Sequence, residues 1–460
     1  VGSILSSGLT TVTGFLALVF MSFQIGPDLG WAMSKAIVFS LISVLCFLPA
    51  LAITTYRLID RTRHRPLVPG FGGFAGLVMK VRIPLLILTL LVVPVSWLAQ
   101  NQNSFYYGGS EVYTSEATQL GRDTKAIREL YGTSNPVVLM VPRGSLEKEA
   151  AMNAELLELD YVTSVISYAN SVGNSIPSDF VPSDTLSSLY SANYSRFILT
   201  LDTEEREADW DQKVNAIRNI GEKYYGNEIQ YAGDLVSTED LKTTITQDNL
   251  KVNLLAIGFV VCILLVNFKS ISLPLILTLV IEASIWINLG LPYFSGNRLF
   301  YIGYLIISTV QLGATIDYAI LFTDRYLEFR KEMPKKDAAR QTLKACTLSI
   351  LTSSLVLTLA GTILGQVSTN GVLSQLGTLI GRGAVLSFVL VIFVLPSLLI
   401  LLDGLIRRTT LNAGFHGTGK RAAGGKGGSG AGSAGTDTPG GRKSEGEKAE
   451  ERNVLTGGAD

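Results

Sequence analysis

Residues 299–323 read LFYIGYLIISTVQLGATIDYAILFT, and this stretch decides how the chain folds. It is long and apolar enough to cross a lipid bilayer, which takes about 20 residues in an α-helix. Its only charged residue is Asp317, which is followed directly by Tyr318. We therefore expect a membrane-spanning helix that carries one carboxyl group inside the membrane.

Apolar runs of similar length recur on both sides of this stretch, so the fold class expected is a polytopic α-helical membrane protein. We predict eight spans, at roughly 4–23, 33–56, 81–99, 252–268, 272–291, 299–323, 341–364 and 378–402. The composition agrees, with 47% hydrophobic residues, 17% charged residues and a mean hydropathy of +0.35. A soluble protein carries about 25% charged residues.

Several classes of function are disfavoured by the same composition. The 38 basic and 38 acidic residues cancel, so nothing favours a nucleic-acid partner. The three cysteines, Cys46, Cys262 and Cys346, lie inside apolar runs and form no CxxC pair. With only two histidines besides, we expect no cofactor, no metal site and no enzymatic activity.

Basic residues set the expected orientation. The connections 57–82 and 325–340 each hold six Lys or Arg residues, and Arg407 and Arg408 follow the last span. Eight spans place all three segments on one side, which the positive-inside rule makes cytoplasmic. The segment 101–250, with 11 basic and 23 acidic residues, then lies outside the cell membrane.

This external segment alternates strand and helix patterns. Strands are expected at 136–141, 162–168, 197–201 and 229–232, with helices at 146–159 and 210–225 and a polar loop at 170–195. Two successive βαβ units in this order predict a ferredoxin-like α+β domain.

The domain organisation follows from these spans. We expect the last two helices of a first half at 1–60, a cytoplasmic linker at 61–80 and a helix at 81–100. The external domain at 101–250 is followed by a five-helix bundle at 251–408. The Gly-rich segment 409–460 is too polar to fold and is expected to be a disordered cytoplasmic tail.

Segments 3–57 and 349–404 resemble each other, and this predicts an internal repeat. Each begins with a hydroxyl-rich stretch and ends on an apolar helix with one proline, Pro49 or Pro396. Both copies run out and back in, as parallel repeats do. A complete first half would add four spans and one external domain, so we expect a chain truncated at its N-terminus and twelve spans in a complete protein.

Asp317 is the leading functional candidate, since ionisable residues inside spans are costly and mark proton or substrate paths. A carboxyl group in a low-dielectric site can take up and release a proton. Tyr318 is expected to donate to it or to pass the proton on. Hydroxyl groups on neighbouring helices are the candidate relay partners, namely Ser349, Thr352 and Ser353 on one span and Ser6 and Ser7 on another. The alternative is that these hydroxyls only pack helices together.

Glu282 is the second acid within a span. Four roles stay open for it: a member of the relay, a residue lining a substrate path, a structural hydrogen bond to a neighbouring helix, or a protonated side chain facing lipid. Asn288 is expected to be a packing residue. Asp324 and Arg325 are expected to pair at the membrane edge.

These residues carry a resemblance to the MMPL branch of the resistance-nodulation-division (RND) superfamily. The motif from Gly313 through Asp317-Tyr318 to Arg325-Tyr326 looks like the proton-relay helix of that family's second half. The segments 10–18 and 25–30 look like helices five and six of its first half, and the resemblance covers about 1–408. It implies a twelve-helix transporter with two external porter domains, in which proton flow through two Asp-Tyr pairs drives lipid export. Only one such pair is present here.

The function expected is export of lipids or other hydrophobic compounds across the plasma membrane, driven by the proton gradient. Its partners would be that substrate, protons, membrane lipids, and either a missing N-terminal half or a second copy of the chain. One rival is a sterol-sensing type of membrane sensor. Another is a protein-export accessory of the same superfamily. An external hydrolase is disfavoured because 101–250 contains no histidine or cysteine.

Overall fold

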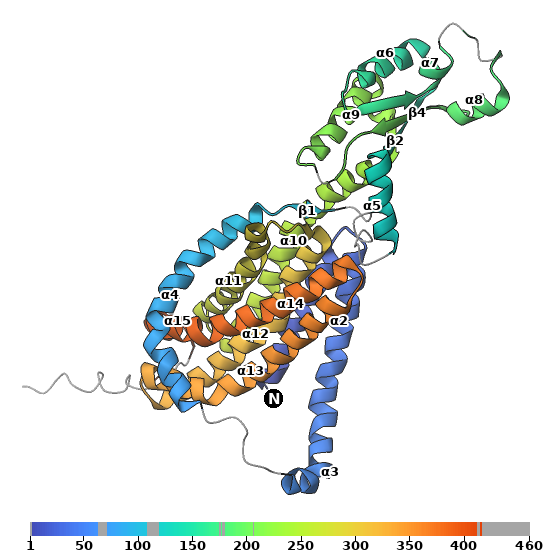
Figure 1. Ribbon diagram of the computed structural model, residues 1–460. Coiled ribbons are helices and arrows are strands. Elements are labelled where there is room, and N and C mark those ends of the chain that lie inside the picture. The colour runs from blue at the N-terminus through green and yellow to red at the C-terminus, as the bar shows by residue number, and fades with distance from the viewer. Residues whose placement is uncertain are drawn as a thin grey trace, which may run out of the picture. The chain divides into compact units, whose positions relative to one another are not determined.

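The computed structural model describes residues 2–62, 71–107, 119–173, 176, 180–205, 207–411 and 415. Within these residues, seven helices are long and apolar enough to cross a membrane (Figure 1). They are Ile25–Arg61, Gly72–Asn101, Asp234–Phe268, Ser272–Ser295, Tyr301–Glu332, Lys335–Val367 and Gly371–Leu401. The predicted tail lies outside the described residues, except for 409–411 and 415.

The first predicted span, 4–23, is shorter than the others. It forms helix α1 (Gly2–Leu16) and the 3-10 turn η1 (Ala17–Phe20), and its apolar part runs only from Leu5 to Phe20. The chain turns back at Ser22, whose backbone N–H and hydroxyl donate to the Asp248 carboxylate at 2.7 and 2.9 Å. Seven described helices, rather than the eight predicted, are therefore long enough to span.

Two other spans extend beyond their predicted ends. Helix α4 (Gly72–Asn101) starts nine residues before the predicted 81 and accommodates Pro84 and Pro94. Helix α10 (Asp234–Phe268) starts in the predicted external domain and continues without a break to the end of the span. Its first turn buries Leu235 and Val236 in the core of that domain. Packing against the sheet therefore extends this helix past the limit of its apolar run.

In both copies of the predicted repeat, the α-helix changes to a wider π-helical segment just before the proline. The π-helical segment η2 (Ser43–Phe47) joins α2 (Ile25–Ile42) to α3 (Leu48–Arg61), just before Pro49. The π-helical segment η6 (Leu390–Val394) joins α14 (Gly371–Val389) to α15 (Leu395–Leu401), just before Pro396. Because proline lacks an N–H group, it removes one hydrogen bond of the preceding turn and so favours such a local distortion. The shared distortion agrees with the repeat.

A four-stranded sheet forms the core of the acidic segment. Its strands are β2 (Asn135–Pro142), β3 (Val162–Ile166), β4 (Tyr194–Leu201) and β5 (Gln230–Gly233), in the order β3-β4-β2-β5 with antiparallel neighbours. Leu139 lies opposite Phe197 on one side and Tyr231 on the other. Alternate residues of β2 and β4 are buried, as the period of two requires. Helices α6 (Leu146–Leu157) and α9 (Trp210–Tyr225) contribute further core side chains, beside those of α10.

The connections in this domain hold more helix than the sequence suggested. Helix α5 (Gln119–Tyr131) precedes the sheet, and η5 (Gly226–Glu228) follows α9. The expected loop at 170–195 contains the end of α7 (Tyr168–Ser171) and all of α8 (Ser183–Leu189). Ser167 caps α7 by accepting from the Asn170 backbone N–H, which is the side-chain interaction that favours a helix start in a polar segment.

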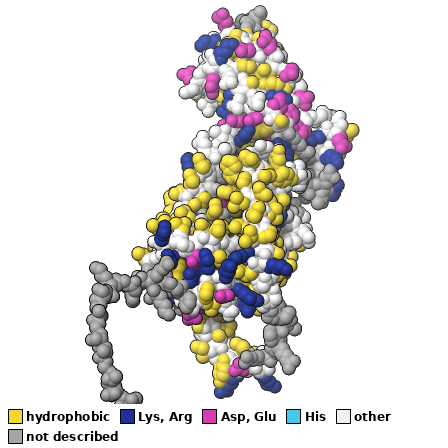
Figure 2. Space-filling view, turned by 90° about the vertical axis from the view of Figure 1, so that its left-hand side faces the viewer, with side chains coloured by type: hydrophobic (Ala, Val, Ile, Leu, Met, Phe, Trp, Pro, Cys, Tyr) yellow, Lys and Arg dark blue, Asp and Glu magenta, His cyan; other side chains and the backbone are white. Residues whose placement is uncertain are grey.

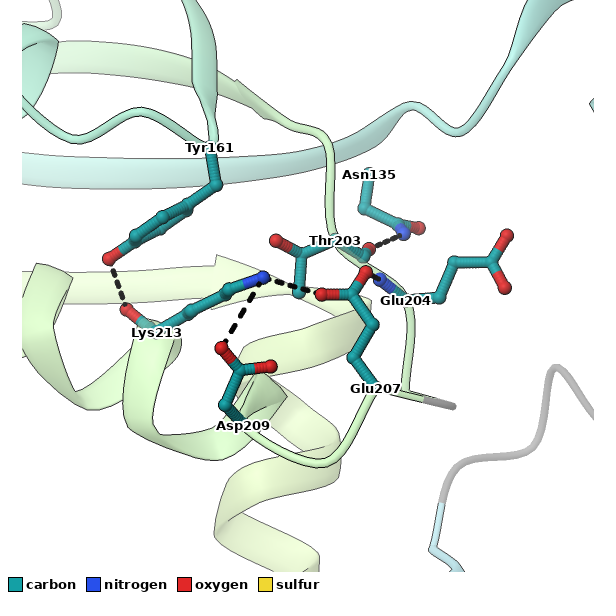
Figure 3. A network of polar contacts seen from close by, with 7 residues as sticks. All are labelled: Asn135, Tyr161, Thr203, Glu204, Glu207, Asp209 and Lys213. Atoms are coloured by element: carbon teal, nitrogen blue, oxygen red, sulfur yellow. Dashed lines mark hydrogen bonds and ion pairs between the residues drawn. The ribbon is translucent and has the colours of Figure 1, made fainter.

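A polar network holds the connection between β4 and α9 (Figure 3). The Lys213 ammonium group lies 2.5 Å from the Glu207 carboxylate and 3.7 Å from that of Asp209. The pKa of Lys213 is raised because it donates a hydrogen bond to Glu207. Glu207 also accepts from the Glu204 backbone N–H at 2.8 Å. These contacts join Glu204, Glu207, Asp209 and Lys213 in one network.

Most residues of helices α11 (Ser272–Ser295) and α12 (Tyr301–Glu332) are buried, which shows that these two helices form the centre of the helical region. Helices α13 (Lys335–Val367) and α14 pack closely side by side through glycines. Gly361 and Gly365 of α13 face Gly377 and Gly381 of α14. A β-carbon at Gly361 would lie 2.5 Å from the Gly381 nitrogen. This pair of GxxxG patterns permits backbone contact, which drives helix association in lipid.

The three basic segments meet at one end of the helices. The Ser397 hydroxyl donates to the Arg82 carbonyl at 3.2 Å, and the Lys335 ammonium group donates to the Ile400 carbonyl at 3.1 Å. Helix α16 (Asp403–Thr409) ends here too. Figure 2 shows an extensive hydrophobic surface over the helices, with Lys and Arg side chains gathered beyond one end and many Asp and Glu side chains toward the other. This arrangement suits an integral membrane protein.

Substituting Gly361→Ala should destabilise the protein by about 1–3 kcal/mol, because the new methyl group has no room without moving α14. The matched control is Gly258→Ala on α10, where a β-carbon meets no atom within 4 Å. Thermal unfolding in detergent, followed by loss of the monodisperse fraction, compares the two. Equal midpoints for both variants would contradict close α13–α14 packing.

Candidate functional site

Asp317 lies in α12, which is covered by several other helices. Its side chain is half-buried, and its Oδ1 atom is buried without a hydrogen-bond partner among the described residues. The adjacent Tyr318 is only 3% exposed. An unpaired buried carboxylate is unstable in a medium of low dielectric constant, so this oxygen favours a proton or a donor brought to it.

Helix α1 approaches the face of α12 that carries Asp317. A β-carbon at Gly14 would lie 3.3 Å from the Gly313 Cα atom, and the Thr11 hydroxyl donates to the Gly313 carbonyl at 2.8 Å. Asp317 follows Gly313 by four residues and therefore shares its face. The two glycines, one on each helix, allow this contact.

The helices run in opposite directions, so the register continues past Thr11. Phe15 lies against Ile306 and Val310, earlier in α12, which shows the antiparallel order. One turn before Thr11 in α1 is the predicted relay partner Ser7, and one turn after Gly313 in α12 is Asp317, so the antiparallel order brings Ser7 to the level of Asp317. Ser6 is buried beside it. The backbone carbonyls of Ser6 and Ser7 accept from the Thr10 hydroxyl at 2.9 and 2.7 Å.

The hydroxyls predicted on α13 lie in different surroundings. The side chain of Ser353 interacts with the Tyr318 hydroxyl, which links the two helices. All three residues are exposed, and the Thr352 hydroxyl donates to the Leu348 carbonyl in its own helix at 2.9 Å. Of the three predicted partners on α13, Ser353 is the one that the structure places against the Asp317-Tyr318 pair.

Glu282 lies on the other side of α12. It belongs to α11, is 5% exposed, and its Oε1 atom is buried without a partner in the described part of the chain. It interacts electrostatically with Tyr304 of α12. Asp317 faces α1, whereas Glu282 comes from α11, so the structure does not bring the two acids together.

A buried polar network between α11, α12 and α14 was not foreseen. The Arg382 Nε and Nη2 atoms donate to the Asn288 Oδ1 and carbonyl oxygen at 2.7 and 2.8 Å. Asn288 donates to Gln311 at 2.8 Å, and Gln311 donates to Ser284 at 3.1 Å. Asn288 is therefore a hydrogen-bonding centre, and the expectation that it only packs was wrong.

A sequence signal for this network existed. Pro292 stands four residues after Asn288 and has no N–H group, so the Asn288 carbonyl lacks its helical donor. Arg382 supplies that donor from the span 378–402, where it is the only basic residue. The single arginine of one predicted span and the proline of another could together have indicated this contact.

At the basic end of the helices, α12 is tied to α16. The Arg330 Nε and Nη2 atoms donate to the two Asp403 carboxylate oxygens at 2.9 and 3.2 Å. The Tyr326 hydroxyl also donates to Asp403, at 3.3 Å. Arg325 pairs with Glu328, one helical turn further on, at 2.6 Å, and it also interacts electrostatically with Asp324, its expected partner.

The family follows from comparison with known proteins. The model of the MMPL family matches residues 1–69 and 110–422. The chain belongs to the MMPL family. This membrane transporter family is the one predicted from the motif around Asp317, and the apolar helices agree with an integral membrane protein.

One solved structure with the same fold is the crystal structure of SecDF in its super-membrane-facing form. The similarity has a TM-score of 0.50 at 15% identity, and covers 88% of this chain and 48% of that one. This MMPL-family chain thus spans about half the length of the SecDF chain. No curated protein matched it in a sequence search.

Labelling with dicyclohexylcarbodiimide, an apolar reagent for protonated carboxyl groups, should separate the unpartnered acids from the paired ones. We expect modification of Asp317 and Glu282 in native membranes at neutral pH, because their buried oxygens lack donors. Asp403 and Asp248 are the internal controls, since hydrogen-bond donors contact their carboxylate oxygens. Peptide mass spectrometry measures all four. Labelling of Asp403 as fast as Asp317 would contradict the distinction.

Proposed function

We propose that this MMPL-family protein takes part in export of lipids or other hydrophobic compounds, driven by protons that bind and leave Asp317. The observation that carries the proposal is the buried Asp317 Oδ1 atom without a partner, in a helix surrounded by others. A carboxylate that is held by hydrogen-bond donors would first have to break those contacts before it could take up a proton. The other buried acids of α10 and α16, Asp248 and Asp403, are held by donors.

In this mechanism Tyr318 and Ser353 connect the carboxyl group to α13. A proton arriving at Asp317 would neutralise it, and the polar groups of α1 and α13 would then be free to rearrange around an uncharged side chain. The hydroxyls of Ser7 and Ser353 are the groups that this change would affect first. Ser349, Thr352 and Glu282 have no assigned step.

Movement of α12 would reach the sheet domain through two continuous elements. Helix α10 carries Leu235 and Val236 in the core of the sheet domain and Val252 among the buried residues of the helices. The start of α12 lies beside β1 (Phe105–Tyr106), which pairs with β6 (Leu299–Phe300). A change at Asp317 thus has a mechanical route to the domain that would handle the substrate.

We further propose that the sheet domain is a ferredoxin-like porter domain outside the plasma membrane. Its sheet order β3-β4-β2-β5, with α6 and α9 as the crossovers, supports this assignment. The acidic character of 101–250 and the basic far end of the helices support the orientation. A second relay helix would come from a first half of the transporter or from another copy of the chain.

The test is proton flux coupled to export. Proteoliposomes with a pH-sensitive dye inside should show proton entry with wild-type protein and about a hundredfold less with Asp317→Asn, since the amide cannot carry a proton. Asp324→Asn, which changes another acid of the same helix nearer its basic end, is the matched control. Unchanged flux in Asp317→Asn protein would contradict the proposal.

A cellular readout separates the rival functions. Lipid analysis of the cell surface should show loss of one lipid class in cells carrying Asp317→Asn. Accumulation of unexported protein precursors, with surface lipids unchanged, would instead favour the protein-export accessory. A signalling response that survives Asp317→Asn would favour the sensor.

A further inference from the structure

Glu282 of α11 is a buried acid that the Asp317 mechanism does not use. Its side chain is 5% exposed, so neighbouring helices enclose it, and its Oε1 atom has no hydrogen-bond partner among the described residues. No charged side chain in the described part of the chain acts on this carboxyl group, and the titratable group beside it is Tyr304 of α12. A carboxylate in such surroundings is unstable, so a proton is its simplest partner.

Tyr304 belongs to an aromatic cluster at the start of α12. Its ring centroid lies 5.7 Å from that of Tyr301, and Tyr301 stacks on Tyr107 with centroids 4.9 Å apart. The Phe105 ring packs edge-on against Tyr301 and Tyr304, at 4.9 and 5.0 Å. The three tyrosines therefore form a continuous stack from the end of β1 into the helical region.

Helix α10 supplies polar partners for the tyrosine hydroxyls. The side chains of Tyr301 and Tyr304 both interact with Asn249. Those of Tyr107 and Tyr301 both interact with Thr246, one turn earlier in α10. Because neighbouring tyrosines share a partner, their hydroxyls belong to one polar network, and tyrosine is among the side chains that transfer protons.

Unpartnered polar atoms continue along the two helices that flank this network. Asn253 lies one turn after Asn249 on α10, and its Oδ1 atom is buried without a partner in the described chain. Thr278 lies one turn before Glu282 on α11, on the same face, and its Oγ1 atom is likewise buried and unpartnered there. Helices α10 and α11 pack against each other. Buried polar atoms of this kind are where bridging waters bind.

The other end of the tyrosine stack lies among charged groups of the sheet domain. The Tyr107 backbone N–H donates to the Glu205 carboxylate, and the Asp211 carboxylate acts on the Tyr107 side chain. Asp211 pairs with Lys242 at 2.5 Å, and the Lys242 ammonium group lies 5.9 Å from the Tyr107 ring centroid. Asp211 and Lys242 are partly exposed, so this end of the network reaches water.

We propose that Glu282 is a second proton-binding site, reached from the sheet domain through the hydroxyls of Tyr107, Tyr301 and Tyr304. In each transfer a phenol oxygen gains one proton and passes its own to the next group, so no charge stays on a tyrosine. The site is separate from Asp317, which faces α1 on the other side of α12. The inference goes beyond the proposed function, which assigns no step to Glu282.

Infrared difference spectroscopy of Asp317→Asn protein in nanodiscs tests the site without a contribution from the first acid. Between about pH 6 and 8, exposed carboxyl groups stay ionised, so a pH-dependent band of protonated carboxyl reports a buried acid. We expect this band in Asp317→Asn protein, and we expect added Glu282→Gln to remove the Glu282 component. The proposal is overturned if Asp317→Asn protein shows no such band, or if the band is unchanged in the double variant.

The route is tested by the rate at which the Glu282 band grows after light releases protons from a caged acid. Tyr304→Phe should slow this growth about a hundredfold, the lower end of what one proton-transfer group contributes, and leave the final amplitude unchanged. Tyr293→Phe, which removes an exposed phenol of α11 at the same end of the helices, is the matched control.

Tyr301→Phe repeats the test at the preceding step of the stack, in case Tyr304→Phe protein does not fold. Equal rates in the tyrosine variants and in the Tyr293→Phe control would overturn the route. All these proteins carry Asp317→Asn as the background. A failure here is therefore distinct from a failure of Asp317 to couple protons to export.

Discussion

The contact between Gly14 of α1 and Gly313 of α12 sets the position of the candidate site. In a membrane the hydrophobic effect does not hold helices together, so association depends on close packing and hydrogen bonds. Both are present here, since the glycines let the backbones meet and Thr11 donates to the Gly313 carbonyl at 2.8 Å. Asp317 lies one turn further along the same face. Its environment is thus fixed by a backbone contact rather than by a partner for its own charge.

Several other buried polar groups of the helices have hydrogen-bond partners, unlike the Asp317 Oδ1 atom. Arg382 satisfies the Asn288 carbonyl that Pro292 leaves without a donor, and Arg330 holds Asp403 through two hydrogen bonds. In a medium of low dielectric constant such pairing is required, because an unpaired polar group costs several kcal/mol. Asp317 and Glu282 each have a buried carboxyl oxygen without a partner among the described residues, as do some uncharged groups such as the Thr278 and Thr323 hydroxyls. An unpartnered acid calls for an explanation, and Asp317 is followed by Tyr318, whose hydroxyl interacts with Ser353 of α13.

Much of this could be read from the sequence. Apolar runs located the helices, period-two alternation located β2 and β4, and the motif around Asp317 identified the family, since each is a local property. Contacts between distant segments could not be read in this way. The span at 4–23 proved shorter, α10 continued into the sheet domain, and Arg382 met Asn288 because packing decides such features. For the same reason Ser353 could not be separated beforehand from Ser349 and Thr352.

The central claim is that the Asp317 carboxyl group changes its protonation in the folded protein. Infrared difference spectroscopy between two pH values measures this directly, through the carbonyl band of a protonated carboxyl group. Glu282→Gln protein serves as the background, so that the second unpartnered acid does not contribute. The account predicts a band that varies with pH in Glu282→Gln protein and that is lost when Asp317→Asn is added to it. The same pH-dependent band in the double variant would contradict it.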